Sequence, residues 1–203
     1  MQHTKISIIF IAIICVSAQC HKPCNESNYL FETTAKFSPQ FDSIQVGDTI
    51  WLTSLIPKPV LDKNSGKTIA YENANWCSTL IISDILKFKE SNRGAISDFD
   101  FSAKIGNIYS APLTDTTNVK QISYQEYVMG YELNIAIIAR KAGSYILTIP
   151  DNQYLFRKNK PKCGTAELVI LNENTDKHLS LFEDVWGSLS AYDKAHCYCV
   201  KVH

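Results

Sequence analysis

Tyr131–Ile149, with the sequence YELNIAIIARKAGSYILTI, decides the fold of this chain. Apolar residues alternate with polar ones on both sides of Lys141–Ser144, a short run that is typical of a turn. Alternation sends every second side chain to the same face, which is the pattern of a half-buried β-strand. The stretch therefore predicts a β-hairpin with one buried face. The inward residues of this hairpin are Tyr131, Leu133, Ile135, Ile137, Tyr145, Leu147 and Ile149.

Shorter stretches of the same kind occur along the rest of the chain. Phe41–Leu52 predicts a strand, a tight turn at Gly47–Asp48 and a second strand. The other predicted strands cover residues 28–36, Cys77–Ile82, Asp98–Tyr109, Thr165–Leu171 and Cys197–Val202. Many short strands separated by turn residues favour an all-β domain over a parallel α/β fold.

One segment near the C-terminus has helical spacing instead. Its apolar side chains lie on one side of a helix, at Leu179, Phe182, Trp186 and Leu189. Asp176 is the predicted N-terminal cap, and Gly187 is where the helix is expected to stop. The complete pattern predicts a mainly β fold: an antiparallel, immunoglobulin-like β-sandwich with one short helix near the C-terminus.

The first residues predict export. Met1–Lys5 is weakly basic, Ile6–Val16 is a continuous apolar run, and Val16-Ser17-Ala18 supplies the small residues of a cleavage site. The apolar run is about half the roughly 20 residues that a membrane-spanning helix needs, so no permanent span is expected. Residues 1–18 are therefore predicted to be a secretory signal peptide, and residues 19–203 a single β-sandwich domain.

Cys20 leaves a second interpretation of this start open. Bacterial lipoproteins are cut directly before a cysteine that then carries lipid, and Cys20 is placed for this chemistry. Ser17 and Gln19 depart from the residues that usually precede such a cysteine. The chain is thus predicted to be secreted or periplasmic. The alternative is a lipid anchor in the outer membrane at Cys20, which would be the only contact with a membrane.

Export also determines the chemistry expected of the cysteines. Of the 7 cysteines, Cys15 lies in the predicted signal peptide, which leaves Cys20, Cys24, Cys77, Cys163, Cys197 and Cys199. An even number in an exported chain predicts disulfides, and six cysteines allow 15 connectivities. Cys197 and Cys199 would lie on the same face of one strand. A bond between residues so close in sequence would be strained, so each is predicted to pair elsewhere.

A metal site is the alternative use of the same side chains. Cysteine and histidine are zinc-like ligands, and they occur at both ends of the mature chain, as Cys20, His21, Cys24, His196, Cys197 and Cys199. The spacing is not that of paired C-x-x-C ligands, and thiolates oxidise readily outside the cytoplasm. No metal and no cofactor are therefore predicted.

Charge and motifs exclude several classes of function. Lys+Arg and Asp+Glu number 20 each, so the formal net charge is zero and no general attraction to nucleic acid or anionic membrane is expected. The sequence contains no nucleophile elbow, H-E-x-x-H zinc motif, phosphate-binding loop or EF-hand loop. We therefore expect a non-enzymatic binding or structural module at the cell envelope, with an unidentified carbohydrate or protein ligand.

Aromatic residues give the candidate binding surface. Trp51 points away from its strand neighbours Ile50 and Leu52, and with Tyr71 or Trp76 it could form a stacking surface. The competing interpretation is that these aromatic residues belong to the core. An alternative function is a secreted carbohydrate-active hydrolase that uses carboxylates as acid and base, with Asp98, Asp100 and Glu126 as candidates.

Two stretches resemble known proteins. Val46–Leu52 (VGDTIWL) and Lys141–Ile149 (KAGSYILTI) resemble segments near the first and last core strands of bacterial immunoglobulin-like domains. Phe41–Leu52, which follows an N-terminal cysteine pair, also resembles uncharacterised exported proteins and lipoproteins of Bacteroidetes. The resemblance implies an exported sandwich and adds weight to lipid anchoring, because such relatives often carry a lipobox. It implies no catalytic residues.

Overall fold

Fifteen strands, two α-helices and two 3-10 helices make up the described chain. The computed structural model describes residues 28–41, 43–90, 93–110, 119–150, 153–158, 165–173 and 178–203. The strands are β1 (Tyr29–Ser38), β2 (Ser43–Ile44), β3 (Thr49–Pro57), β4 (Val60–Leu61), β5 (Thr68–Ile69), β6 (Cys77–Asp84), β7 (Phe99–Ile105), β8 (Asn107–Ser110), β9 (Val119–Ser123), β10 (Gln125–Glu126), β11 (Gly130–Ala139), β12 (Gly143–Thr148), β13 (Gln153–Leu155), β14 (Ala166–Asn172) and β15 (Cys197–Val202). The helices are η1 (Ile85–Lys87), η2 (Ile96–Asp98), α2 (Ser180–Trp186) and α3 (Ala191–His196).

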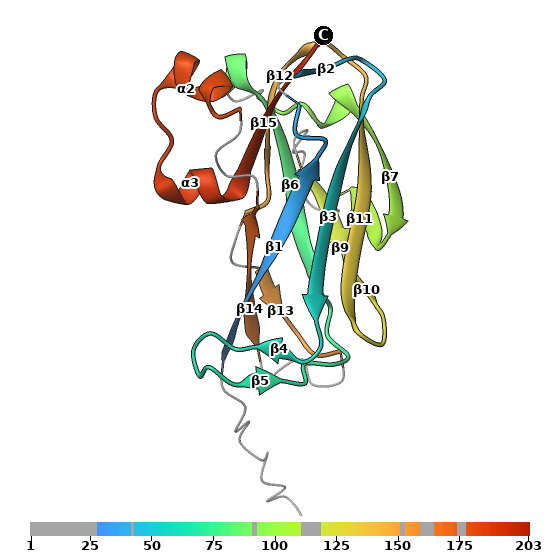
Figure 1. The fold of residues 1–203 in the computed structure, drawn as a ribbon. Coiled ribbons are helices and arrows are strands. Elements are labelled where there is room, and N and C mark those ends of the chain that lie inside the picture. Colours follow the sequence, from blue (N-terminus) through green and yellow to red (C-terminus); the bar gives the residue numbers. More distant parts are fainter. Residues whose placement is uncertain are drawn as a thin grey trace, which may run out of the picture.

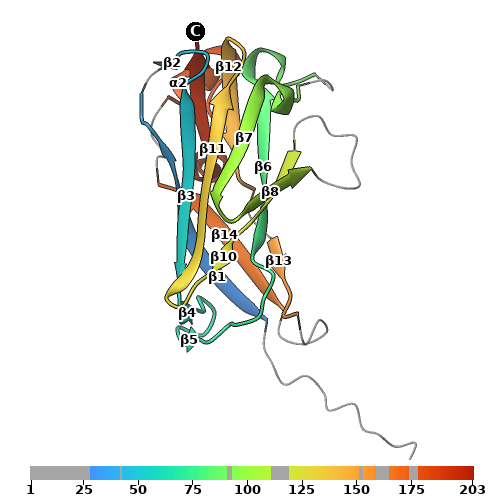
Figure 2. The same ribbon diagram turned by 90° about the vertical axis from the view of Figure 1, so that its right-hand side faces the viewer.

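Two sheets pack face to face, as Figures 1 and 2 show. Sheet A has seven strands in the order β10-β11-β3-β1-β14-β13, and its seventh strand, β7, also pairs with β11. Sheet B has six strands in the order β2-β15-β12-β6-β9-β8. The pairs β1–β14 and β15–β2 are parallel, and the other pairs within the two sheets are antiparallel. The predicted β-sandwich is confirmed.

The predicted hairpin within Tyr131–Ile149 is wrong. Strand β11 pairs with β3, β7 and β10 in sheet A, whereas β12 pairs with β6 and β15 in sheet B. Arg140–Ala142 therefore carries the chain from one sheet to the other. Alternation specifies which side chains point inward but not which strand supplies the hydrogen bonds. Here the two inward faces meet across the core instead of lying side by side.

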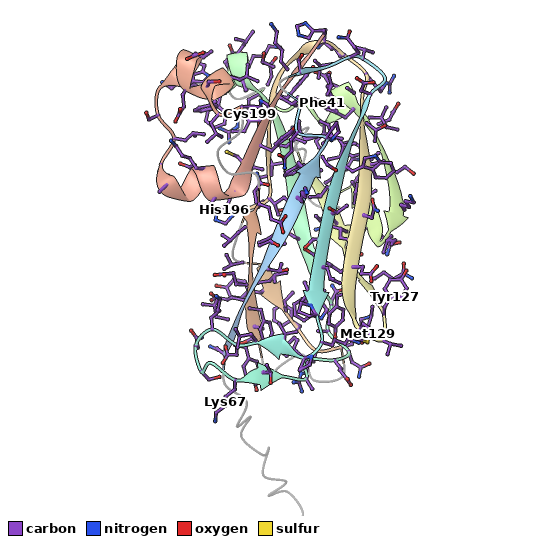
Figure 3. All side chains as sticks on the ribbon, in the orientation of Figure 1. Phe41, Lys67, Tyr127, Met129, His196 and Cys199 are labelled. Carbon is purple, nitrogen blue, oxygen red and sulfur yellow. The ribbon has the colours of Figure 1, made fainter. Side chains whose placement is uncertain are left out.

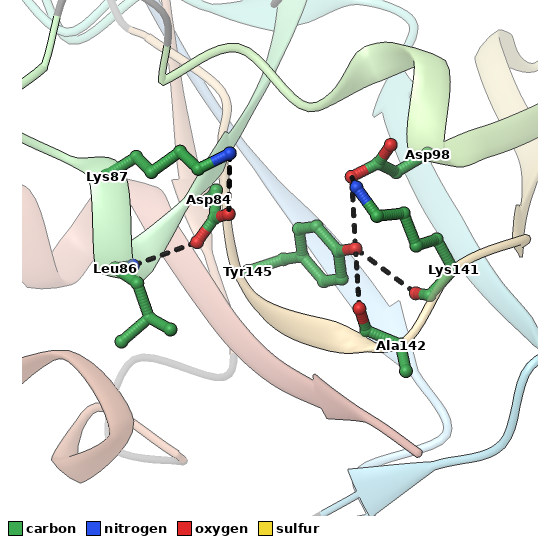
Figure 4. Close-up of polar contacts among 7 residues, drawn as sticks. All are labelled: Asp84, Leu86, Lys87, Asp98, Lys141, Ala142 and Tyr145. Carbon is green, nitrogen blue, oxygen red and sulfur yellow. Dashed lines mark hydrogen bonds and ion pairs between the residues drawn. The ribbon is translucent and has the colours of Figure 1, made fainter.

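Polar contacts hold this crossing in place (Figure 4). The Tyr145 hydroxyl lies 3.1 Å from Asp98 Oδ2 and 3.1 Å from the carbonyl oxygen of Lys141. Lys141 also forms an ion pair with Asp98, with 3.4 Å between Nζ and Oδ2. Burial, together with the neighbouring Asp98 carboxylate, raises the pKa of Tyr145, so its hydroxyl keeps its proton and remains a donor. The residue before β7 is thereby tied to the start of β12.

The core lies between the sheets and takes residues from both. All of the predicted inward residues of β11 and β12 belong to it. Sheet A also contributes Phe31, Phe37, Ile50, Leu52 and Ile56, and sheet B contributes Leu80, Ile82, Ile122, Tyr198 and Val200. Ring contacts connect strands that are distant in sequence, as with the stacked pair Phe37 and Tyr198, whose centroids are 5.1 Å apart. The predicted set of inward side chains is thus confirmed, although the predicted pairing of the two strands is wrong.

A second apolar cluster covers the outer face of sheet B. Helix α2 places Leu179 and Phe182 against Ile146 of β12 and the two cysteines of β15. Figure 1 shows α2 and α3 beside β15. The helix ends at Gly187, as predicted, and its φ of +86° is one that glycine adopts without strain. The predicted cap Asp176 lies outside the described residues.

The expectation of a single helix near the C-terminus needs correction, because α3 follows α2. Ser190 caps α3 by accepting a hydrogen bond from the amide of Asp193, at 3.1 Å. Helix α3 has six residues and no apolar stripe, so hydrophobic spacing alone gave no sign of it. It leads directly into β15, and its last residue, His196, contacts Ile170 of β14.

We expect the corner at Gly106 to be more sensitive to substitution than the turn at Gly66. Gly106 joins β7 of sheet A to β8 of sheet B, and both glycines have positive φ, +84° and +68°. A Cβ on Gly106 would clash with the carbonyl oxygen of Ser123, whereas a Cβ on Gly66 meets nothing within 4 Å. Gly66→Ala should therefore cost about 1 kcal/mol of unfolding free energy, and Gly106→Ala roughly 3 kcal/mol. Urea unfolding of the two variants measures this, and equal losses would contradict the described corner.

Candidate functional site

The outer face of sheet A is open. Outward residues from β1, β3 and β11 form transverse rows, one of which contains Thr34, Leu55 and Glu132, and the next Lys36, Thr53 and Asn134. Within the described residues, the apolar cluster built by α2 lies on sheet B, not on this face. An open groove of about 470 Å³ runs across these rows. Sheet A is therefore the face that the fold leaves available for a ligand.

The groove has a mixed chemical character. Leu55 is 56% exposed and lies on β3, between the outward residues of β1 and β11. Around it lie the hydroxyl groups of Thr34 and Thr53, and Thr34 donates a hydrogen bond to Glu173 Oε1 at 2.7 Å. The side-chain oxygen of Asn134 is buried in the groove and has no hydrogen-bond partner among the described residues. Because it is buried, this oxygen is not exposed to a ligand, and the threonine hydroxyl groups and Glu173 supply the polar character of the groove.

Trp51 lies on the same outer face, as predicted from the alternation of β3. Its cross-strand neighbours are Ser38 and Ala136, and the ammonium group of Lys104 lies 5.4 Å from the ring centroid. The indole is half-buried and its face is covered by the lysine. Trp51 thus borders the groove but does not present a bare stacking platform.

Tyr71 and Trp76 do not join Trp51 in a surface, because both are buried in the core. They belong to an aromatic cluster at the end of the sandwich that carries β4 and β5, which we call the lower end (Figure 1). The Tyr131 hydroxyl donates to the carbonyl of Tyr71 at 2.7 Å. The proposed binding surface of Trp51, Tyr71 and Trp76 is therefore not assembled, and the competing core interpretation holds for Tyr71 and Trp76.

The described cysteines are free thiols. Cys77, Cys197 and Cys199 form no disulfide with one another, whereas Cys20, Cys24 and Cys163 lie outside the described residues, so the disulfide pairing stays a prediction. Cys197 and Cys199 lie on one face of β15, as alternation predicts, and both are buried against α2. The hydrogen bond with Cys197, together with burial, raises the pKa of Cys199, so this thiol is protonated and unreactive.

A small cavity of about 200 Å³ lies beside these thiols. Its lining includes Cys197, His196, Asp193 and Arg93, a set of residue types that could suggest thiol catalysis. His196 is however buried, and its Nδ1 lies 2.9 Å from the carbonyl oxygen of Ile170. Because a carbonyl oxygen only accepts hydrogen bonds, Nδ1 donates there and the ring connects the end of α3 to β14. His196 therefore has a structural contact.

The three candidate carboxylates do not converge. Asp98 contacts Tyr145 and Lys141 at the upper end of the sandwich, opposite the lower end. Asp100 forms an ion pair with Arg140 at 3.2 Å. Glu126 lies instead next to the turn that follows β10, where it pairs with Lys58 at 2.6 Å. Each acid thus has its own cationic partner, and no pair of them shares a groove in a way that acid–base catalysis of glycoside cleavage requires.

The described ranges hold neither a cluster of metal-ligating side chains nor a membrane-spanning helix. No group of three or more His, Cys, Asp or Glu side chains there could hold a metal ion. His21 and the N-terminal cysteines of the alternative metal site lie outside the described residues. Among the described residues, no helix has the length and apolar character needed to cross a membrane.

Comparisons with known proteins give only distant likenesses. No protein-family model and no curated protein matches the chain. A type I cohesin from Pseudobacteroides cellulosolvens is 6% identical with a TM-score of 0.38, and the match covers 86% of this chain and 93% of the cohesin. The human F-spondin reeler domain is 9% identical with a TM-score of 0.38, covering 92% and 99% of the two chains. A non-cellulosomal cohesin from the archaeon Archaeoglobus fulgidus is 8% identical with a TM-score of 0.30, covering 70% and 94%. TM-scores this low carry no argument about what this chain does.

We expect the three described thiols to differ in accessibility. In the folded protein iodoacetamide should modify the half-buried Cys77 first, although burial raises the pKa of Cys77 and slows the reaction. Cys197 and Cys199 should react only after unfolding, without any reducing agent. Trypsin places both in the peptide Ala195–Lys201, so mass spectrometry can assign each label. If Cys197 and Cys199 in this peptide became alkylated only after a reducing agent was added, they would be in disulfides, and the description of them as free thiols would be contradicted.

Proposed function

We propose that this chain is an exported, non-enzymatic binding module whose ligand docks on the outer face of sheet A. The observation that carries the proposal is the difference between the two outer faces. On sheet B, α2 and the second apolar cluster cover β12 and β15, whereas sheet A exposes a groove lined by Leu55 and polar side chains. A face that stays open with an apolar centre and a polar rim has the composition of a protein-binding surface.

A protein ligand fits this face better than a carbohydrate. Sugar rings stack on bare aromatic faces, and the one tryptophan of this surface, Trp51, is covered by Lys104. A protein ligand can instead place an apolar side chain against Leu55 and a polar group against the hydroxyl groups of Thr34 and Thr53. Lys36, Glu132 and Glu173 supply charges of both signs around that centre, which favours a partner with a mixed polar surface.

The cell envelope is the proposed location. It is supported by the signal-peptide pattern of residues 1–18, and the resemblance to exported proteins of Bacteroidetes supports the same location. A hydrolase is not proposed, because Asp98, Asp100 and Glu126 are separately paired with Lys141, Arg140 and Lys58.

Site-specific photo-cross-linking tests the binding face. A photoreactive amino acid is placed at Leu55, or at Val185 on α2 as the matched control, and the protein is produced in its native host. Both side chains are solvent-exposed, at 56% and 45%, so neither replacement disturbs the core. Illumination of intact cells should give a discrete protein adduct from position 55 and none from position 185. Adding Thr53→Arg beside the photoreactive residue should remove most of that adduct.

The proposal fails if position 55 gives no adduct in folded protein, or if both positions give the same products. Circular dichroism and the unfolding midpoint of each variant establish that the fold is intact. Adducts from position 185 alone would instead assign binding to the helical side of the sandwich.

A further inference from the structure

A turn at the lower end of the sandwich exposes three consecutive apolar residues. Tyr127, Val128 and Met129 join β10 to β11 and are 40%, 91% and 77% exposed. Figure 3 shows Tyr127 and Met129 near the lower end, whereas Phe41 lies near the upper end. Isolated exposed apolar residues are ordinary, but a consecutive group at a projecting turn is typical of an interaction site.

Part of the backbone of this turn is hydrogen-bonded within the protein. The amide of Tyr127 donates to the carbonyl of Gly130 at 2.8 Å, and the amide of Lys58 donates to the carbonyl of Met129 at 3.0 Å. Lys58 also forms an ion pair with Glu126 and lies over the Tyr131 ring. The carbonyl of Tyr127 accepts from Lys58 Nζ at 3.1 Å, so two of the three carbonyls of the turn are paired within the protein, which lowers the cost of entering an apolar medium. Tyrosine beside aliphatic side chains is the composition found where proteins meet the lipid interface.

The N-terminal part of the chain approaches the same end. Strand β1 begins at Tyr29, whose ring lies 5.9 Å from that of Tyr71 in the aromatic cluster of the lower end. Asn64, in the loop between β4 and β5, donates to the carbonyl of Asn28. Cys20, the candidate lipidation site, precedes Tyr29 by only nine positions in the sequence. Nine residues reach at most about 30 Å, so a lipid on Cys20 would keep the lower end close to the bilayer.

We propose that the Tyr127–Met129 turn inserts into the interface of a lipid bilayer, with the strands of the sandwich directed away from the membrane. Val128 and Met129 would enter the acyl region, each raising partition by about tenfold, and the Tyr127 hydroxyl would remain among the headgroups. The open face of sheet A would then stand upright on the membrane and remain accessible to a partner. The proposal does not depend on the binding function of that face, which is tested separately at Leu55.

Fluorescence quenching by lipid tests this orientation. Val128→Trp and Phe41→Trp are made in the mature protein isolated from its native host, and each is mixed with phosphatidylethanolamine–phosphatidylglycerol vesicles that carry brominated acyl chains. Phe41 is a matched control because it is an exposed apolar residue, at 62%, near the opposite end. The emission added by Trp at position 128 should be largely quenched, and the emission added at position 41 should be unchanged. Vesicles without bromine correct for the three native tryptophans.

Two results would overturn the proposal. Absence of quenching at position 128 would show that the turn does not enter the bilayer, whether or not Cys20 carries a lipid. Equal quenching at positions 128 and 41 would show that neither end is preferred. A further variant combines Tyr127→Trp with Val128→Asp and Met129→Asp. It should need a vesicle concentration at least tenfold higher than Tyr127→Trp alone to reach the same quenching, because two charged groups resist transfer into the interface.

Discussion

The crossing of the chain at Arg140–Ala142 is the constraint on which the rest of the structure depends. It puts β11 in sheet A and β12 in sheet B, so that their inward residues face one another across a single core. The Tyr145 hydroxyl and the Asp98–Lys141 ion pair hold this corner, and Gly106 provides another crossing from β7 to β8. Each crossing makes both sheets contribute to one buried layer, which supplies most of the apolar burial that stabilises the fold.

The same arrangement makes the two outer faces different. Strands β12 and β15 carry apolar residues on both of their faces, and α2 covers the outer ones, Ile146, Cys197 and Cys199. The outer face of sheet A instead carries hydroxyl groups, charges and the exposed Leu55. The covered face buries both thiols of β15. The open face and the apolar turn at Tyr127–Met129 are where the molecule can meet other molecules.

Much of the local structure could be predicted from the sequence because it depends on neighbouring residues. Alternation in β11 and β12 identified the inward side chains, and Gly187 ended the helix where predicted. Strand pairing could not be predicted in this way, since any two alternating strands can form a hairpin or face each other. The apolar Ile146, between inward neighbours, was the available signal that sheet B is covered on both sides.

The candidate site was predicted only in part, for the same reason. Trp51 was correctly placed on an outer face, but the burial of Tyr71 and Trp76 depends on ring contacts with Phe31 and Tyr131, which are far away in sequence. Disulfides at Cys197 and Cys199 were predicted from their number and compartment, whereas their surroundings under α2 depend on the tertiary fold. Leu55 lies beyond Leu52, where the predicted strand ended, so its outward position follows only from the pairing of β3 with β11.

Nuclear Overhauser contacts between backbone protons test the central claim most directly, because they identify which strands are neighbours. The described fold predicts contacts between Ile135 and Leu52, which pair β11 with β3, and between Leu147 and Tyr198, which pair β12 with β15. It also predicts none between the backbones of Ile135 and Leu147. Regular backbone contacts between β11 and β12 would mean that Tyr131–Ile149 is a hairpin within one sheet, and would contradict the crossing and the two distinct faces that follow from it.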